Sequence, residues 1–100
     1  MQIVWTQPAL TDVLEAQAYV AADSLRYGQL VAERIFEAVE QLEAFPLSGR
    51  VVPELRSATV RELIAAPYRI VYRVRAEVLE IIAVVHSARQ FPVSDVRARP

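Results

Sequence analysis

The sequence contains no cysteine and no lysine, a single histidine and only two glycines. Without cysteine it can form neither a disulfide nor a thiolate metal site. A metal site built on histidine normally needs more than one, so we expect no metal and no cofactor. All 11 basic residues are arginines, which we attribute to genome composition rather than to function.

Long apolar runs are also missing. The longest lies between Val78 and Val85 and is interrupted by Glu80, so it is too short and too polar to span a membrane. The first five residues lack the basic start and apolar stretch of a signal peptide. We therefore expect a cytoplasmic protein with no membrane partner.

The charges nearly cancel. Eleven arginines stand against 12 acidic residues, which gives a formal net charge of −1. A protein that binds nucleic acid on its own usually carries a clear positive excess. This balance argues against a free-standing nucleic-acid-binding protein.

The first half of the chain has the pattern of a strand followed by two helices. Residues 2–6 alternate in a β-prone manner, and Pro8 then favours the first turn of a helix over residues 8–22. Either Asp23 or Ser24 could cap a second helix, whose apolar stripe continues to Phe45 and ends at Pro46. Helices so close in sequence should form an antiparallel hairpin.

The second half is β-prone. Residues 60–66, 68–75 and 78–86 form three runs separated by Pro67 and by Ala76-Glu77, which predicts an antiparallel meander. The whole is an α+β domain with the helices packed on one face of the sheet. We assign residues 1–92 to this single domain and residues 93–100 to a loose, polar C-terminal tail.

The last hairpin allows a prediction of register. If Ala76-Glu77 is a two-residue turn, the facing pairs are Arg75 with Val78, Arg73 with Glu80, Val71 with Ile82, and Arg69 with Val84. The helix-facing side then carries Ile70, Tyr72, Val74, Leu79, Ile81, Ala83 and Val85. The opposite side carries Arg69, Val71, Arg73, Glu80, Ile82, Val84 and His86.

On that opposite side Val71, Ile82 and Val84 would form an exposed apolar strip. One interpretation is a solvated surface with an Arg73–Glu80 pair. The other is a docking site for a partner helix or peptide, because exposed apolar strips often mark such sites.

Local motifs along the chain resemble the ParE branch of the RelE/ParE toxin superfamily. They are Val4-Trp5-Thr6, Phe45-Pro46, Gly49-Arg50, Pro53-Glu54-Leu55, Arg61-Glu62-Leu63, the run Pro67-Tyr68-Arg69-Ile70-Val71-Tyr72-Arg73, and Val85-His86 with Arg89. Their order and spacing carry the resemblance, which spans about Ile3 to Pro92.

The resemblance implies the toxin of a bacterial type II toxin–antitoxin system. Such toxins are neutralised by a cognate antitoxin, which alone contacts the operator DNA. The ParE branch inhibits DNA gyrase and so arrests growth; the RelE branch instead cleaves messenger RNA on the ribosome. We expect the antitoxin to contact Val71, Ile82, Val84, Arg69 and Arg73, or the outer side of the first helix.

RNA cleavage would need a base, an acid and cations around the scissile phosphate. The candidates are Arg61, Arg69, Arg73 and His86. Lysines are missing and Ser87 stands where some RelE-type enzymes have a tyrosine, so gyrase inhibition without enzymatic activity is the leading hypothesis. Ribosome-dependent RNA cleavage is the alternative, and a degenerate member that only binds an antitoxin is a third.

Four aromatic or arginine positions allow two interpretations each. Arg69 is either a contact to a partner or one half of an ion pair with a carboxylate such as Glu62. Tyr68 and Tyr72 alternate with arginines, which can signal nucleic-acid binding, but their predicted face favours the core. Trp5 is likewise expected in the core.

Overall fold

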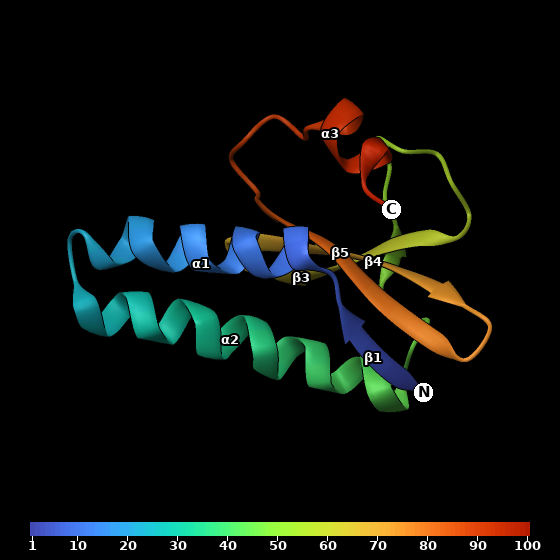
Figure 1. The fold of residues 1–100 in the computed structure, drawn as a ribbon, viewed down its shortest axis with the longest axis horizontal. Coiled ribbons are helices and arrows are strands. Elements are labelled where there is room, and N and C mark those ends of the chain that lie inside the picture. The colour runs from blue at the N-terminus through green and yellow to red at the C-terminus, as the bar shows by residue number, and fades with distance from the viewer.

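The computed structural model covers residues 1–100 and contains five strands and three helices. In chain order they are β1 (Gln2–Trp5), α1 (Gln7–Ala21), α2 (Leu25–Ala44), β2 (Arg50–Val51), β3 (Val60–Ala65), β4 (Tyr68–Arg75), β5 (Val78–His86) and α3 (Val93–Ala98). The α+β class and the strand, helical hairpin and meander order are confirmed (Figure 1).

Both helices of the hairpin begin at side-chain caps. The Thr6 hydroxyl accepts a hydrogen bond from the Ala9 N–H (3.4 Å) and donates one to the Ile81 carbonyl (2.8 Å). Ser24, rather than Asp23, caps α2, because its hydroxyl accepts from the Tyr27 N–H (3.3 Å). The caps satisfy backbone donors that the first turn of a helix leaves free.

Gly28 lies in close contact with α1. A Cβ atom at Gly28 would lie 2.7 Å from the Cβ of Ala21 and 2.9 Å from the backbone oxygen of Gln17. Neither neighbour can move without moving α1. The absence of a side chain at Gly28 therefore sets how closely the two helices pack.

We expect Gly28→Ala to lower the free energy of unfolding by about 1–2 kcal/mol, because overpacking outweighs the gain in helix propensity. The control is Gln29→Ala, which alters an exposed neighbour on the same helix. Urea denaturation measures both. A Gly28→Ala variant more stable than the parent would contradict this prediction, because α1 and α2 could then move apart without a loss of stability.

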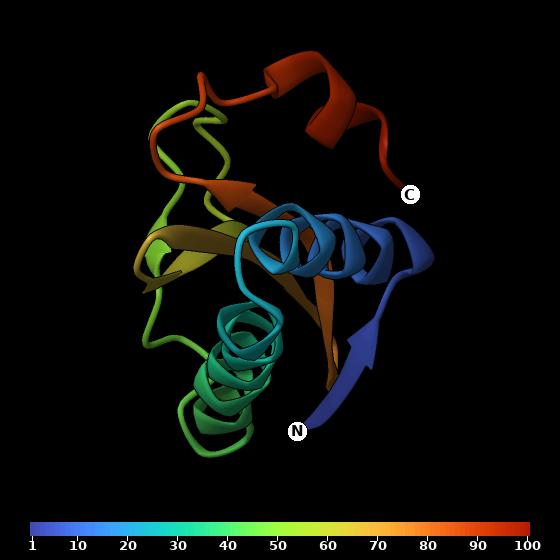
Figure 2. The ribbon, with the colours of Figure 1, turned by 90° about the vertical axis from the view of Figure 1, so that its left-hand side faces the viewer.

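The five strands form one mixed sheet in the order β1-β5-β4-β3-β2. β3, β4 and β5 make the predicted antiparallel meander, and β1 joins its edge parallel to β5, with Trp5 opposite Ile81. α1 and α2 lie on one side of the sheet, and α3 lies on the side away from α2 (Figure 2). β5 continues past the end of β1, so residues 82–86 have no strand on that edge.

A β-bulge makes part of the predicted register wrong. Arg75 faces Val78 and Arg73 faces Glu80 as expected, but Val71 pairs with Ala83 and Arg69 pairs with Val85. Ile82 is the extra residue, and one inserted residue reverses the alternation beyond it. Val84 therefore turns to the helix side, while Ala83 and Val85 turn to the opposite side.

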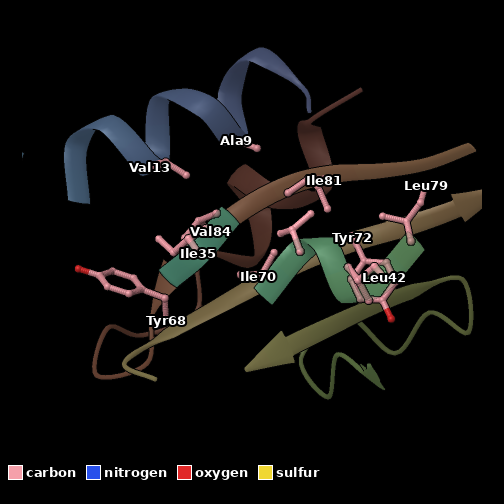
Figure 3. Packing of buried hydrophobic residues seen from close by; sticks show 11 residues of the cluster. Ala9, Val13, Ile35, Leu42, Tyr68, Ile70, Tyr72, Leu79, Ile81 and Val84 are labelled. Carbon is pink, nitrogen blue, oxygen red and sulfur yellow. The ribbon is translucent and has the colours of Figure 1, made fainter. Parts of the chain in front are cut away.

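Two hydrophobic clusters lie on the two faces of the sheet. On the helix side, Ile70, Ile81 and Val84 pack with Val13 of α1 and Ile35 of α2 (Figure 3). Tyr68 and Tyr72 are buried in this cluster, and Trp5 packs at its border, edge to face with Phe36. The three aromatic residues are thus in or against the core, as predicted.

The second cluster corrects the prediction for the opposite face. Its members are Val52, Leu55, Val71, Ile82, Ala83, Val85, Phe91 and Val96. Val71 and Ile82 are covered by the chain's own C-terminal segment and by the 52–55 loop, and Val84 is buried against the helices. The predicted exposed strip is therefore wrong.

Residues 93–100 are not a loose tail. Residues 93–98 form α3, Val96 is buried, and Arg99 donates two hydrogen bonds to the carboxylate of Asp12 on α1 (2.6 and 3.2 Å). An apolar anchor and a charged anchor hold this segment on the sheet. None of the helices has the length and apolarity that crossing a membrane requires.

Candidate functional site

Arg69 lies at the centre of a charged network on the α3 side of the sheet. Its Nη1 and Nη2 donate to the two carboxylate oxygens of Glu54 (2.9 and 2.6 Å), and its Nε donates to Glu62. Glu62 also accepts from Nε of Arg50 (2.8 Å). The network joins β2, β3 and β4 to the loop that follows β2.

The Arg69–Glu62 pair at the centre of the network is removed from solvent. The Glu62 side chain is 0% exposed and the Arg69 side chain is 10% exposed. The Arg69 guanidinium also lies 4.6 Å from the centre of the Phe91 ring, a cation–π distance. All three donor nitrogens of Arg69 are thus engaged within the chain, and the ion pair with Glu62 is the interpretation that the structure supports.

The pKa values of this network follow from its hydrogen bonds. The hydrogen bonds that Arg69 donates lower the pKa of Glu54 to about 2, although burial alone would raise it. Its bonds to Glu54 and Glu62 in turn raise the pKa of Arg69. Both groups therefore remain charged across the physiological range.

A second feature is a groove of about 450 Å³ between α1 and the end of β5, called here the α1–β5 groove. Its walls are Asp12, Glu15, Ala16, Tyr19, Tyr68, Val84, His86 and Arg89. The rings of His86 and Tyr68 pack edge to face, with their centres 5.3 Å apart. Burial is the main cause that raises the pKa of Tyr68, and the nearby Tyr19 raises it further. The groove has an apolar interior and a polar rim.

Asp12 lines this groove and also caps the open edge of β5. Its Oδ2 accepts from the Val84 N–H (2.9 Å) and from Nη1 of Arg99 (2.6 Å). The Ile82 carbonyl accepts a further hydrogen bond from Arg99 (3.0 Å). One carboxylate thus connects α1, β5 and the C-terminal segment.

Comparison with known proteins assigns the family. Residues 3–91 match the model of the ParE toxin of type II toxin–antitoxin systems. The chain belongs to the ParE toxin family. The predicted resemblance to RelE/ParE toxins is therefore confirmed.

Two relatives and one solved structure support the assignment. Toxin RelE2 of Caulobacter vibrioides is 36% identical over 89 residues, covering 88% of this chain and 97% of the relative. The Y4kP protein of Sinorhizobium fredii is 39% identical over 93 residues, covering 91% and 93%. A chain of the chromosomal ParDE system of P. aeruginosa shares the fold, with a TM-score of 0.73, 22% identity and coverage of 86% and 95%.

The structure separates the four candidate RNA-cleaving residues of this ParE-family chain. Arg69 and Arg73 lie on the α3 side of the sheet, whereas Arg61 and His86 lie beside Tyr72 and Tyr68 on the helix side. Those tyrosines are four residues apart on β4, so Arg61 and His86 are separated by roughly 13 Å along the sheet. The four side chains do not share one site.

Each candidate also has a structural partner. The Arg61 guanidinium donates to the Gly49 carbonyl (2.8 Å), and Arg73 donates through Nε to Glu80 (3.2 Å). Nδ1 of His86 accepts from the Ala88 N–H (3.0 Å). These contacts explain the positions of the three side chains, and no catalytic role is needed to account for them.

Sequence reasoning missed Asp12 and Arg99 as a pair. They are 87 positions apart, and neither lies in a motif that predicts a contact. Glu54 was noted only as part of a family motif, and no pattern in the sequence pointed to Arg69 as its partner. A buried arginine with two carboxylates can be recognised only when three segments are brought together.

Proposed function

We propose that this ParE-family toxin acts in the cytoplasm, where it inhibits DNA gyrase, blocks replication and so arrests growth, unless a cognate antitoxin binds it. Membership of the ParE family carries the proposal. The arrangement of the charged residues adds to it. Acid–base cleavage of RNA needs its groups within hydrogen-bond reach of one phosphate, and the four candidates lie on two faces of the sheet.

The charge balance agrees with a protein target. The net charge is −1, and the guanidinium of Arg69 is neutralised by Glu54 and Glu62. A toxin that docks on ribosomal RNA would benefit from free cations for the phosphates. Binding to a protein such as gyrase does not require that excess.

We expect the purified toxin to inhibit DNA supercoiling by gyrase in a concentration-dependent manner. The control is the toxin preincubated with its antitoxin, which should restore supercoiling. A ribosome-dependent messenger RNA cleavage assay, run in parallel, tests the alternative. No inhibition at high micromolar toxin, together with RNA cleavage that His86→Ala and Arg61→Ala abolish, would replace gyrase with the ribosome as the target.

We further propose that the antitoxin docks on the α1–β5 groove and not on the α3 side of the sheet. Tyr19 at the groove is 81% exposed. The backbone of β5 beyond Ile81 has no neighbouring strand there. Because Asp12 and Arg99 already bond the Val84 N–H and the Ile82 carbonyl, side-chain contacts in the groove carry this docking proposal, and strand addition does not. In this arrangement the toxin reaches operator DNA only through the antitoxin.

Tyr19→Asp should weaken antitoxin binding by about tenfold or more, because it places a charge in an apolar contact. Tyr27→Asp is the matched control, since Tyr27 is also exposed (62%) but lies on α2 outside the groove. Isothermal titration calorimetry compares the two variants. Equal losses of affinity would move the docking site away from the groove.

A further inference from the structure

A second, smaller cavity lies beneath α3. It has a volume of about 180 Å³ and is bounded by β3, β4, β5, the loop after β2 and the C-terminal segment. Its apolar wall consists of Leu55, Val60, Ile82 and Val96. Its polar wall consists of Ser57 and three arginines, Arg73, Arg97 and Arg99. No carboxylate lines it.

Arg73, which lines the cavity, has one nitrogen without a partner. Nη2 of Arg73 is buried and makes no hydrogen bond. Nε of the same guanidinium donates to Glu80 (3.2 Å), and Glu80 is shared with Arg75, whose Nε lies 3.6 Å away. A buried cationic donor without an acceptor is costly, so Glu80 satisfies the Arg73 guanidinium only in part.

The other two arginines differ in how far they are neutralised. Arg99 is held by Asp12 and Asp95, so its charge is balanced. Arg97 has no carboxylate partner and reaches only the Leu55 carbonyl, at 3.5 Å. Arg73 shares its single carboxylate with Arg75. Arg97 is therefore the lining arginine whose charge no carboxylate balances, and it lies in the same lining as the incompletely bonded Arg73.

The aliphatic wall narrows the kind of anion. An inorganic phosphate would bring oxygen atoms against Leu55, Val60, Ile82 and Val96, where they could not form hydrogen bonds. An alkyl carboxylate would place its hydrocarbon on that wall and its two oxygens toward the guanidinium groups. This combination matches both halves of the lining.

We propose that the cavity beneath α3 binds a carboxylate carried on a short aliphatic group. Arg73 and Arg97 hold the carboxylate, and the wall formed by Leu55, Val60, Ile82 and Val96 takes the alkyl chain. Two sources have this chemistry: a small aliphatic acid, or the C-terminal residue of a polypeptide that ends in an aliphatic side chain. The inference does not depend on gyrase or on the position of the antitoxin.

The test is a titration of the full-length chain followed by backbone amide NMR shifts, with 4-methylpentanoate as the probe. Saturable shifts are expected at Ser57, Val60, Ile82 and Arg97. The uncharged 4-methylpentanamide and inorganic phosphate, at matched ionic strength, should produce no saturable shift there. Equal binding of phosphate or of the amide would overturn the assignment to a carboxylate, and no saturation with 4-methylpentanoate would overturn the site.

Charge variants test the roles of the arginines. Arg73→Gln and Arg97→Gln should each raise the dissociation constant by about tenfold or more. Arg34→Gln removes the same charge from an exposed position on α2, away from the cavity and from Glu80, so it should bind as the parent does. Arg97 is exposed, so its replacement keeps the test valid if Arg73→Gln is poorly folded. An Arg97→Gln variant with unchanged affinity would contradict the proposed contact.

A pair of short peptides that end in leucine distinguishes the two sources. One carries a free C-terminal carboxylate and the other a C-terminal amide. Tighter binding of the free acid than of 4-methylpentanoate, with none by the amide, assigns the cavity to a polypeptide terminus. Binding of 4-methylpentanoate without binding of either peptide assigns it to a small acid.

Discussion

Arg69→Met is expected to lower the free energy of unfolding by about 3–5 kcal/mol, which is the usual cost of removing one member of a buried ion pair. Methionine fills a similar volume but leaves the carboxylate of Glu62 with only Arg50 as a charged partner. The Glu62 side chain is fully buried, and Arg50 is 62% exposed. The stacking of the guanidinium on Phe91 is lost as well.

Arg50→Met is the matched control, because it removes the other arginine that is bonded to Glu62. We expect a loss below about 1 kcal/mol, since the pair is open to solvent on the Arg50 side. Urea denaturation at neutral pH gives both values. Equal effects of the two substitutions would mean that Arg69 is not the residue that neutralises Glu62.

The same variant should change how stability depends on pH. In the parent chain Glu54 has a pKa of about 2, below its ordinary value of 4.5, because Arg69 donates hydrogen bonds to it. A lowered pKa gives stability that is present above pH 4.5 and is lost as the pH falls toward 2. In the Arg69→Met variant, protonation of Glu54 should no longer reduce stability between pH 4.5 and pH 2. Acid denaturation curves of the two chains would show this difference.

Val96→Asp is expected to lower stability by about 3 kcal/mol or more, through lost apolar burial and the placing of a charge among apolar side chains. Val96 is 3% exposed and packs in the cluster that contains Val71, Ile82 and Phe91. If α3 detached from the sheet, the charge would reach solvent and the loss of stability would be smaller, but the cluster beneath α3 would be exposed. We therefore also expect faster amide exchange in residues 91–99.

Ser94→Asp is the control for Val96→Asp. It introduces the same charge into the same helix, at an exposed position in the first turn, where a negative charge is mildly favourable. Its stability should equal or slightly exceed that of the parent. A Val96→Asp variant with parental stability and slow exchange would mean that α3 does not depend on its apolar anchor.

The sequence by itself determined the elements and the fold class. β4 and β5 were predicted over the residues that they occupy, and β3 to within one residue, because β-prone runs were bounded by Pro67 and by Ala76-Glu77. The helical hairpin followed from apolar spacing and from cap residues. The family was also recognisable, since its motifs are local and ordered along the chain.

Only the tertiary structure decided which face each residue of β5 occupies. A bulge at Ile82 reverses the alternation, and no local residue preference marks it. Val84 therefore packs against the helices, although strict alternation with Arg73 and Glu80 placed it on the opposite face. The error follows from applying a two-residue period across an inserted residue.

The tertiary structure also decided what covers the second face. Residues 93–100 read as a polar tail because Val93 and Val96 are the only large apolar residues among arginines and small polar groups. They become an anchored segment when Val96 reaches the far cluster and Arg99 reaches Asp12, 87 residues away. Contacts over such distances depend on where the sheet and α1 place their partners, which a local pattern does not encode.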